Sequence, residues 1–117
     1  MKNELHHHLT NVSTDDNAAT ATLSLPADFA GFQGHFPENP VLPGVCLVQA
    51  GVILAETAAG KELRMTALKR AKFLSPVGVD DPVELSCTLT DLKAKVSITR
   101  GEDRVAQFSL VLQEVDA

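Results

Sequence analysis

The chain has 117 residues, of which 44% are hydrophobic and 21% are charged, and its formal net charge is −5. The length suits one domain spanning residues 1–117, and the composition supports a hydrophobic core and shows no signature of disorder. The acidic balance argues against nucleic acid or an anionic membrane as the main partner, because both select a basic face.

No apolar run reaches the length that spans a bilayer, and the first residues lead into histidines, not into a signal sequence. The two cysteines, Cys46 and Cys87, are typical of free thiols in a reducing compartment. We therefore expect a cytoplasmic protein.

A period-two pattern predicts the first clear strand. Apolar and polar side chains alternate from residue 19 to residue 25, as in a half-buried strand, and Pro26 ends the run. Residues 4–11 predict a further strand upstream. We expect it to carry His6-His7-His8 on its surface, because these histidines lack the cysteine or acidic ligands that would complete a metal site.

Residues 31–43 predict a loop, because two glycines and three prolines fall within them. From Gly44 to about Ala59, apolar residues lie on nearly every side, so we expect a helix that the protein surrounds. Pro43 fits the first turn of this helix, where its missing N–H costs nothing, and Gly60 fits its C-terminal end.

Only strand patterns follow the helix. Residues 65–74 predict one strand, which Ser75-Pro76 closes, and residues 83–89 alternate as a second. Two more apolar runs, at 96–98 and 106–112, flank a turn at residues 101–103 and predict an antiparallel hairpin.

One long apolar helix among five or six antiparallel strands has few packing solutions. A sheet curled around the helix buries its sides, so the predicted fold class is α+β with the helix at the centre. Because a sheet this small leaves edges and part of the helix uncovered, we also expect a dimer.

The segment GHFPENPVLPGV, residues 34–45, resembles the signature GHFPGxPVMPGV of the FabZ/FabA-type 3-hydroxyacyl-(acyl carrier protein) dehydratases. The match is dense from Gly31 to about Ala50 and continues more loosely through residues 68–85. The Pro-His-Arg lead-in that is usual in this family is missing. The resemblance implies the hot-dog fold, a curled antiparallel sheet wrapped around one long central helix.

The resemblance also implies an activity, the elimination of water at C2–C3 of a 3-hydroxyacyl thioester, with no metal or cofactor. His35 would remove the C2 proton, since imidazole titrates near working pH; the alternative is a loop histidine that caps backbone groups. Backbone N–H groups at Gly44 and Val45 would bind the thioester carbonyl, because donors at a helix N-terminus stabilise a developing enolate. The residues expected to contact substrate are Phe36, Pro43, Ile53 and Glu56.

The carboxylic acid that protonates the departing hydroxyl in this family falls at Gln49. An amide cannot act as a general acid, although it can hydrogen-bond a hydroxyl group. Because general acid–base assistance contributes roughly 10²–10⁴-fold, we expect a hydro-lyase of weak activity.

Three explanations of Gln49 stay open. Another carboxylate replaces it, either Glu38 in the loop or Glu56, which lies about 10 Å further along the helix at ~1.5 Å per residue. For Glu56, a capping or solvated charge near the helix end is the competing role. Alternatively, the chain pairs with a paralogue that carries an acid. Otherwise it binds acyl thioesters without catalysis, or hydrolyses them as a hot-dog thioesterase.

Basic residues in the loosely matching segment suggest a carrier contact. Lys69, Arg70 and Lys72 would receive a strongly acidic acyl carrier protein or the phosphate of its arm; a solvated strand face is the alternative, and acyl-CoA is the alternative carrier. We expect Cys46, in the first helical turn, to be a buried structural thiol. The expected assembly is a homodimer or an oligomer of dimers, or a heterodimer with a paralogue.

Overall fold

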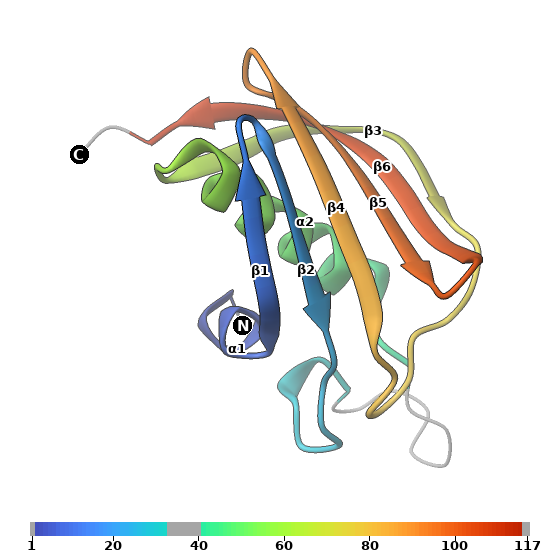
Figure 1. Ribbon diagram of the computed structural model, residues 1–117. Helices are drawn as coiled ribbons and strands as arrows, with labels where there is room; N and C mark the ends of the chain where they lie inside the picture. The colour runs from blue at the N-terminus through green and yellow to red at the C-terminus, as the bar shows by residue number, and fades with distance from the viewer. Residues whose placement is uncertain (1, 33–40, 116–117) are drawn as a thin grey trace.

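The computed structural model describes residues 2–32 and 41–115. In them, six antiparallel strands form one sheet that curls around a long helix, in the order β1-β2-β4-β5-β6-β3 (Figure 1). The main elements are α1 (Lys2–His7), β1 (Leu9–Asp15), β2 (Ala18–Leu23), α2 (Gly44–Ala59), β3 (Leu63–Phe73), β4 (Val83–Thr90), β5 (Lys93–Arg100) and β6 (Asp103–Glu114). The predicted α+β class and the hot-dog arrangement are confirmed.

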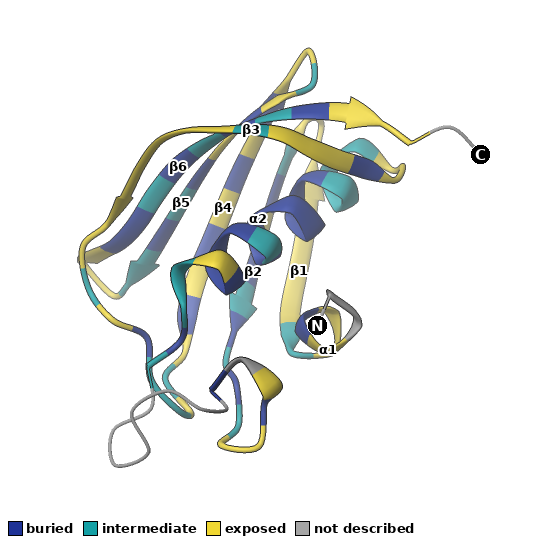
Figure 2. Cartoon of the chain, turned by 180° about the vertical axis from the view of Figure 1, so that it is seen from behind, coloured by how far each residue is buried: buried dark blue, intermediate teal, exposed yellow. Residues whose placement is uncertain are grey.

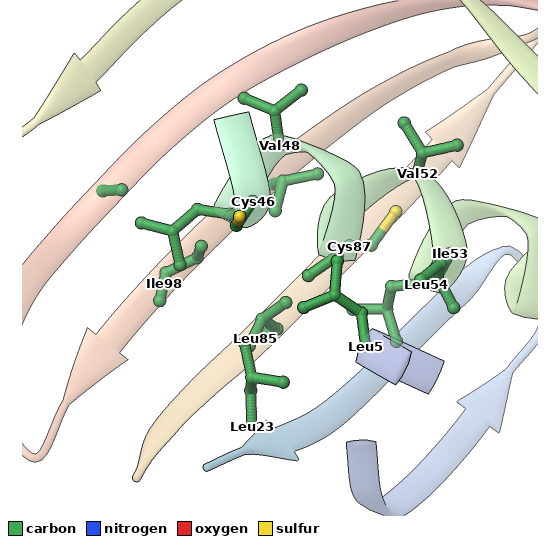
Figure 3. Close-up of a cluster of buried hydrophobic side chains, with 14 of the residues drawn as sticks. Leu5, Leu23, Cys46, Val48, Val52, Ile53, Leu54, Leu85, Cys87 and Ile98 are labelled. Carbon is green, nitrogen blue, oxygen red and sulfur yellow. The ribbon is translucent and has the colours of Figure 1, made fainter. Parts of the chain in front are cut away.

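The predicted alternation separates the two faces of the sheet. In β4, Val83, Leu85, Cys87 and Leu89 are buried, while the residues between them are exposed. Pairing of β5 with β6 around residues 101–102 confirms the predicted hairpin. The buried face packs against α2, and its side chains form the core of the molecule (Figures 2 and 3).

Helix α2 spans the predicted residues and packs tightly on the sheet. A Cβ atom at Gly51 would lie 2.8 Å from the Phe108 ring, so the absence of a side chain lets the helix approach β6. Pro43 is the N-cap residue of α2 and does not lie within its first turn. Gly60 caps the other end with φ of 70°, a left-handed conformation that suits glycine.

The prediction of a strand over residues 4–11 is wrong for its first half. Residues 2–7 form helix α1, so His6 and His7 are helical, and β1 starts only at Leu9. The Leu5 side chain is fully buried and packs beside Ile53 and Leu54 of α2 (Figure 3). This tertiary contact outweighs the weak local pattern, because most of the stability of a short helix in a protein comes from packing of its apolar side.

Most of α2 is buried, as predicted, and a single chain leaves part of the helix uncovered, which was also expected for so small a sheet. Val45 is 67% exposed and Gln49 is half-buried, whereas Cys46 and Ala50 are fully buried against the sheet. The strands cover one side of the helix (Figure 2), and on the flank near β3 Val48 and Val52 are also buried, so that flank is open at Val45 and in part at Gln49. None of the described helices is long and apolar enough to cross a membrane.

Strand β3 is an edge of the sheet, and its inner face is apolar and uncovered. Seven large hydrophobic side chains are exposed among the described residues, and six of them lie on β3, just after it, or beside it. These six are Val45, Met65, Leu68, Phe73, Leu74 and Val115. Such an edge exposes both unpaired backbone groups and apolar surface, which favours pairing with another chain.

Candidate functional site

The start of α2 presents backbone N–H groups without a side-chain cap. Pro43 makes no side-chain hydrogen bond to the helix, and its carbonyl accepts from the Cys46 N–H at 3.0 Å. The amides of Gly44 and Val45, which we predicted to bind a carbonyl, lie at this helix end. No acidic residue lies in the first turn, so the positive end of the helix dipole is not neutralised there.

Phe73, the last residue of β3, closes against this helix start. A Cβ atom on Gly44 would lie 3.2 Å from the Phe73 ring, so the aromatic ring rests on glycine backbone. Phe73 also contacts Phe108, with ring centroids 6.4 Å apart. A groove of about 350 Å³ runs beside this contact and is lined by Val41, Leu42, Gly44, Leu47 and residues 73–77.

A second groove, of about 490 Å³, contains Gln49. Its apolar lining on the helix is Val45, Val48 and Val52, of which Val48 and Val52 project away from the sheet-facing side of α2 (Figure 3). Residues 62–65 and Val115 form the opposite wall. A polar amide in an apolar groove at this place can hydrogen-bond a hydroxyl group on a bound chain.

Sequence reasoning missed two charged residues of this groove, Glu62 and Arg64. Of the residues that line it, Glu62 is the one carboxylate, and the Arg64 guanidinium donates to the Gln113 side chain at 2.8 Å. Neither residue belongs to a recognisable motif. The fold brings them to Gln49 because β3 begins just after the end of α2 and turns back along it.

The other predicted substrate contacts are dispersed. Ile53 is buried in the core and lines neither groove. The Glu56 carboxylate accepts a hydrogen bond from the Leu63 N–H at 2.9 Å, which ties the end of α2 to the start of β3. This contact agrees with the capping role that we weighed for Glu56. His35, Phe36 and Glu38 lie outside the described residues.

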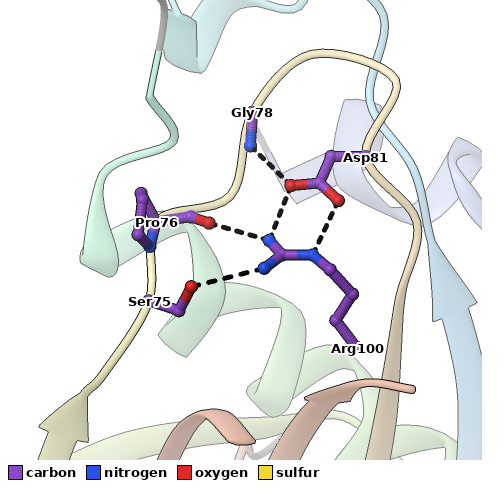
Figure 4. Close-up of polar contacts among 5 residues, drawn as sticks. All are labelled: Ser75, Pro76, Gly78, Asp81 and Arg100. Carbon is purple, nitrogen blue, oxygen red and sulfur yellow. Dashed lines mark hydrogen bonds and ion pairs between the residues drawn. The ribbon is translucent and has the colours of Figure 1, made fainter. Parts of the chain in front are cut away.

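A charged cluster fixes the segment beside the helix start. The Arg100 guanidinium donates to both carboxylate oxygens of Asp81, at 2.8 and 2.6 Å, and to the Pro76 carbonyl at 2.8 Å (Figure 4). It also donates to the Ser75 hydroxyl at 3.3 Å. The Val77 carbonyl in turn accepts from the Leu42 N–H at 2.8 Å. The cluster therefore holds residues 75–77 against the residue that precedes Pro43.

The pKa of Asp81 reflects two opposing influences. Burial raises it, but hydrogen bonds from Arg100 and from the Gly78 N–H, together with the Arg100 charge, bring the pKa below its ordinary value. Asp81 thus stays ionised at neutral pH and keeps its bidentate pair with Arg100, the geometry in which such pairs are strongest.

Both cysteines are buried thiols. Burial raises the pKa of Cys46, although the chain's N-terminal charge lowers it slightly, and burial raises the pKa of Cys87 to about 11. Neither environment favours a thiolate, so the structure supports the structural role that we predicted for Cys46.

The three basic residues predicted to contact a carrier are exposed on β3. Lys69 pairs with Ser109 and Lys72 with Gln107, both on the outer face of β6, away from α2. Lys69 and Arg70 line an outer groove and share no groove with Gln49.

Comparisons with known proteins place this geometry in a family. The model of the ApeI-like family, described as ApeI dehydratase, matches residues 11–109. A 3-hydroxyacyl-[acyl-carrier-protein] dehydratase FabZ from Oleidesulfovibrio alaskensis is 37% identical over 98 residues, which cover 76% of this chain and 64% of that protein. The FabZ from Pediococcus pentosaceus is 34% identical over 104 residues, which cover 79% and 68%. The chain thus spans roughly two thirds or less of the length of the curated relatives that it matches.

A solved structure shows the same fold. The dehydratase heterocomplex ApeI:P from Xenorhabdus doucetiae superposes with a TM-score of 0.81 at 20% identity, over 89% of this chain and 95% of that one. The family match covers most of the present chain, and it includes the loop motif and the helix that carries Gln49. The chain therefore belongs to the ApeI-like dehydratase family and shares the hot-dog fold of the FabZ/FabA-type dehydratases.

Proposed function

We propose that this protein is a dehydratase of 3-hydroxyacyl thioesters, which removes water across C2–C3 to give the trans-2-enoyl thioester. The observation that carries the proposal is the uncapped start of α2, with its Gly44 and Val45 amides beside an apolar groove. In the proposed reaction, these N–H groups stabilise the negative charge that develops on the thioester oxygen as the C2 proton leaves.

His35 is the proposed base. It precedes the helix start by nine residues in a motif shared with the dehydratases, and imidazole accepts a proton near neutral pH. The cluster of Arg100 and Asp81 supports this chemistry indirectly, because it fixes residues 75–77 and, through Val77, the approach to Pro43.

Proton donation to the departing hydroxyl is the step that we expect to be slow. Gln49 can hold the hydroxyl or a water molecule but cannot donate an acidic proton. Glu62 shares its groove and, in our proposal, supplies this proton slowly through water. A paralogue subunit with an acid at the position of Gln49 is the alternative source, and the ApeI:P complex shows that this fold occurs in heterocomplexes.

The proposed working unit is a dimer joined at the β3 edges. Six exposed apolar side chains gather at this edge and beside the open flank of α2. A second copy would extend the sheet and cover this apolar surface. It would also close the groove that holds Gln49 from solvent. The acyl chain would then lie between the two copies, shielded from water.

The direct test is a dehydration assay of the purified protein with a 3-hydroxyacyl thioester, read by the absorbance of the enoyl product. We expect slow alkene formation by the wild type. The His35→Ala variant should lose at least about 100-fold, since a general base contributes roughly 10²–10⁴-fold. Glu62→Gln should lose activity while leaving the thermal melting temperature unchanged.

The products separate the alternatives. Release of free thiol without an alkene would assign the protein to the thioesterases. Binding of the thioester without turnover, in the wild type and in a Gln49→Glu variant alike, would assign it to binding alone. Activity that appears only after a paralogue subunit is added would support the heterodimer.

A further inference from the structure

One connection of the fold, between β3 and β4, binds both ends of the segment that carries the dehydratase motif. At the downstream end, the Leu42 N–H donates to the Val77 carbonyl at 2.8 Å, two residues before Gly44. At the upstream end, the Leu25 carbonyl accepts from the Asp80 N–H at 2.8 Å, two residues after β2. The placement of this segment therefore depends on the shape of the connection.

Both contacts lie in a buried region of the molecule. Leu25, Leu42 and Val77 are each less than 5% exposed. Hydrogen bonds between such residues are costly to break, because a buried donor or acceptor without a partner is strongly unfavourable. Movement of the connection would therefore carry both ends of the motif segment with it.

Arg100, the last residue of β5, binds this connection from the side of the sheet. Its guanidinium donates four hydrogen bonds: two to the Asp81 carboxylate, one to the Pro76 carbonyl and one to the Ser75 hydroxyl (Figure 4). A planar guanidinium offers its donors in a fixed fork, so these contacts fix direction as well as distance. One side chain thereby joins both ends of the stretch 75–81.

These bonds fall on either side of the two backbone groups that hold the motif segment. Pro76 precedes Val77, Gly78 follows it, and the Gly78 N–H donates to the Asp81 carboxylate at 3.1 Å. Asp81 in turn follows Asp80. Because these neighbours are all tied to one ion pair, the Val77 carbonyl and the Asp80 N–H keep their directions.

The hairpin of β5 and β6 provides a second support, which is made by backbone alone. The Val105 carbonyl accepts from the Leu74 N–H at 2.8 Å and from the Ser75 N–H at 3.2 Å. This support holds the start of the connection, whereas Arg100 holds the part that binds the motif segment. Loss of the Arg100 side chain should therefore release that part and leave the start of the connection in place.

We propose that Arg100 is a positioning residue: through residues 75–81 it fixes both ends of the motif segment, and at the downstream end it places the Gly44 and Val45 amides. This role rests on the proposed function and deepens it, because Arg100 lines neither groove of the site and acts through backbone contacts. Donors that stabilise a developing negative charge must stand at fixed positions, and a misplacement of about 1 Å can cost on the order of 10²-fold in rate.

The first test is amide hydrogen exchange of the native protein, which does not depend on activity. In Arg100→Ala, the Leu42 and Asp80 N–H groups should exchange at least about tenfold faster, because the connection that they join is no longer fixed. The Leu74 N–H, which the Val105 carbonyl holds, should change less than about twofold. Arg104→Ala, at an exposed position on the neighbouring strand β6, is the matched control and should leave all three amides unchanged.

Arg100→Lys keeps the positive charge and so separates charge from geometry. A lysine has a single ammonium group and cannot reproduce the fork that joins Asp81 to Pro76. Exchange at Leu42 and Asp80 should therefore rise in this variant too, while its melting temperature stays closer to that of the wild type than the melting temperature of Arg100→Ala does.

The second test is steady-state kinetics with a 3-hydroxyacyl thioester, well below the melting temperature of each variant. Arg100→Ala should lower kcat at least about tenfold and change KM less than about threefold, because it displaces the amides that stabilise charge and leaves the apolar groove in place. Guanidinium ion at millimolar concentration should restore part of kcat, since the Arg100 side chain is 32% exposed and its site is open to solvent. Sodium ion at the same ionic strength should not, and a variant inactivated by unfolding would gain nothing from guanidinium.

Unchanged exchange at Leu42 and Asp80 in Arg100→Ala would overturn the proposal. Faster exchange with an unchanged kcat, in a protein that turns over, would overturn it as well. Faster exchange at both amides in a protein without any turnover would contradict the proposed function and leave the role of Arg100 in fixing the motif segment standing.

Discussion

The two flanks of α2 differ in how completely the chain itself buries them. The flank on the sheet is closed: Cys46, Ala50 and Leu54 are buried, and Gly51 lies against the Phe108 ring with no room for a side chain. The opposite flank has buried valines at 48 and 52, but it also carries an exposed Val45 and the half-buried amide of Gln49. An apolar surface that the chain itself does not cover needs another occupant, and here we propose a second copy and an acyl chain.

The closed flank should tolerate change least. In Gly51→Val, the new side chain would meet the Phe108 ring and Val96, which overpacks the core. We expect a loss of about 1–3 kcal/mol in the free energy of unfolding, with the melting temperature lowered on the order of 5–10 °C. Chemical denaturation measures the first quantity and thermal denaturation the second. A variant as stable as the wild type would show that the helix can move away from β6 at no cost.

The Arg100–Asp81 cluster should come next, with an effect that depends on pH. Removal of the carboxylate charge in Asp81→Asn leaves a partly buried Arg100 without its ionic partner, which should cost about 1–2 kcal/mol at neutral pH. Because folding lowers the pKa of Asp81, its contribution is present above the ordinary carboxyl pKa and is lost as pH falls through the folded-state value.

The wild type should therefore lose stability as the pH falls below about 4, since ordinary aspartate titrates there. Asp81→Asn should lose less over the same interval. Melting curves of the two proteins at pH 6, 4 and 3 provide the check. Parallel loss in both proteins would mean that other carboxylates account for the acid sensitivity.

Substitution at the open edge should alter assembly and leave the fold of each chain intact. Leu68→Glu places a charge on the uncovered inner face of β3, where the chain itself does not bury it. Sedimentation should show a shift from dimer to monomer, with an unchanged far-ultraviolet spectrum. A wild-type protein that is monomeric at high concentration would rule out the proposed dimer.

The smallest effect is expected at the exposed end of the open flank. Val45→Ala removes two methyl groups from a side chain that is 67% exposed, so the stability of the single chain should change by less than about 0.5 kcal/mol. Helix propensity even favours alanine over valine. A much larger loss in dilute solution would indicate that a partner already covers this residue.

The sequence predicted the positions of the helices and strands better than it predicted their tertiary contacts. Strict alternation in β4 and the glycine after Ala59 are local signals, and both were correct. The small size of the sheet predicted that part of α2 would stay uncovered, but apolar residues on all sides of the helix do not reveal which flank that is. The pairing of Asp81 with Arg100 could not be predicted either, because the two residues are distant in sequence and meet only through the sheet.

The helix of residues 2–7 shows a different limit. A single buried leucine between polar residues satisfies a strand pattern as well as a helical one, and only its contact with α2 decides. Glu62 was missed for a related reason, because its role depends on the return of β3 along the helix. The motif around His35 and Gly44, in contrast, identified the family directly from local sequence.

The most direct test of the open flank as a reaction site is the rate of enoyl thioester formation by Gln49→Glu relative to the wild type. A carboxyl group at this position supplies the missing proton donor, so we predict a gain of at least about tenfold in kcat, within the roughly 10²–10⁴-fold range of general acid–base catalysis. An unchanged or lower kcat, in a variant that remains folded and still needs His35, would contradict the placement of the substrate hydroxyl at Gln49.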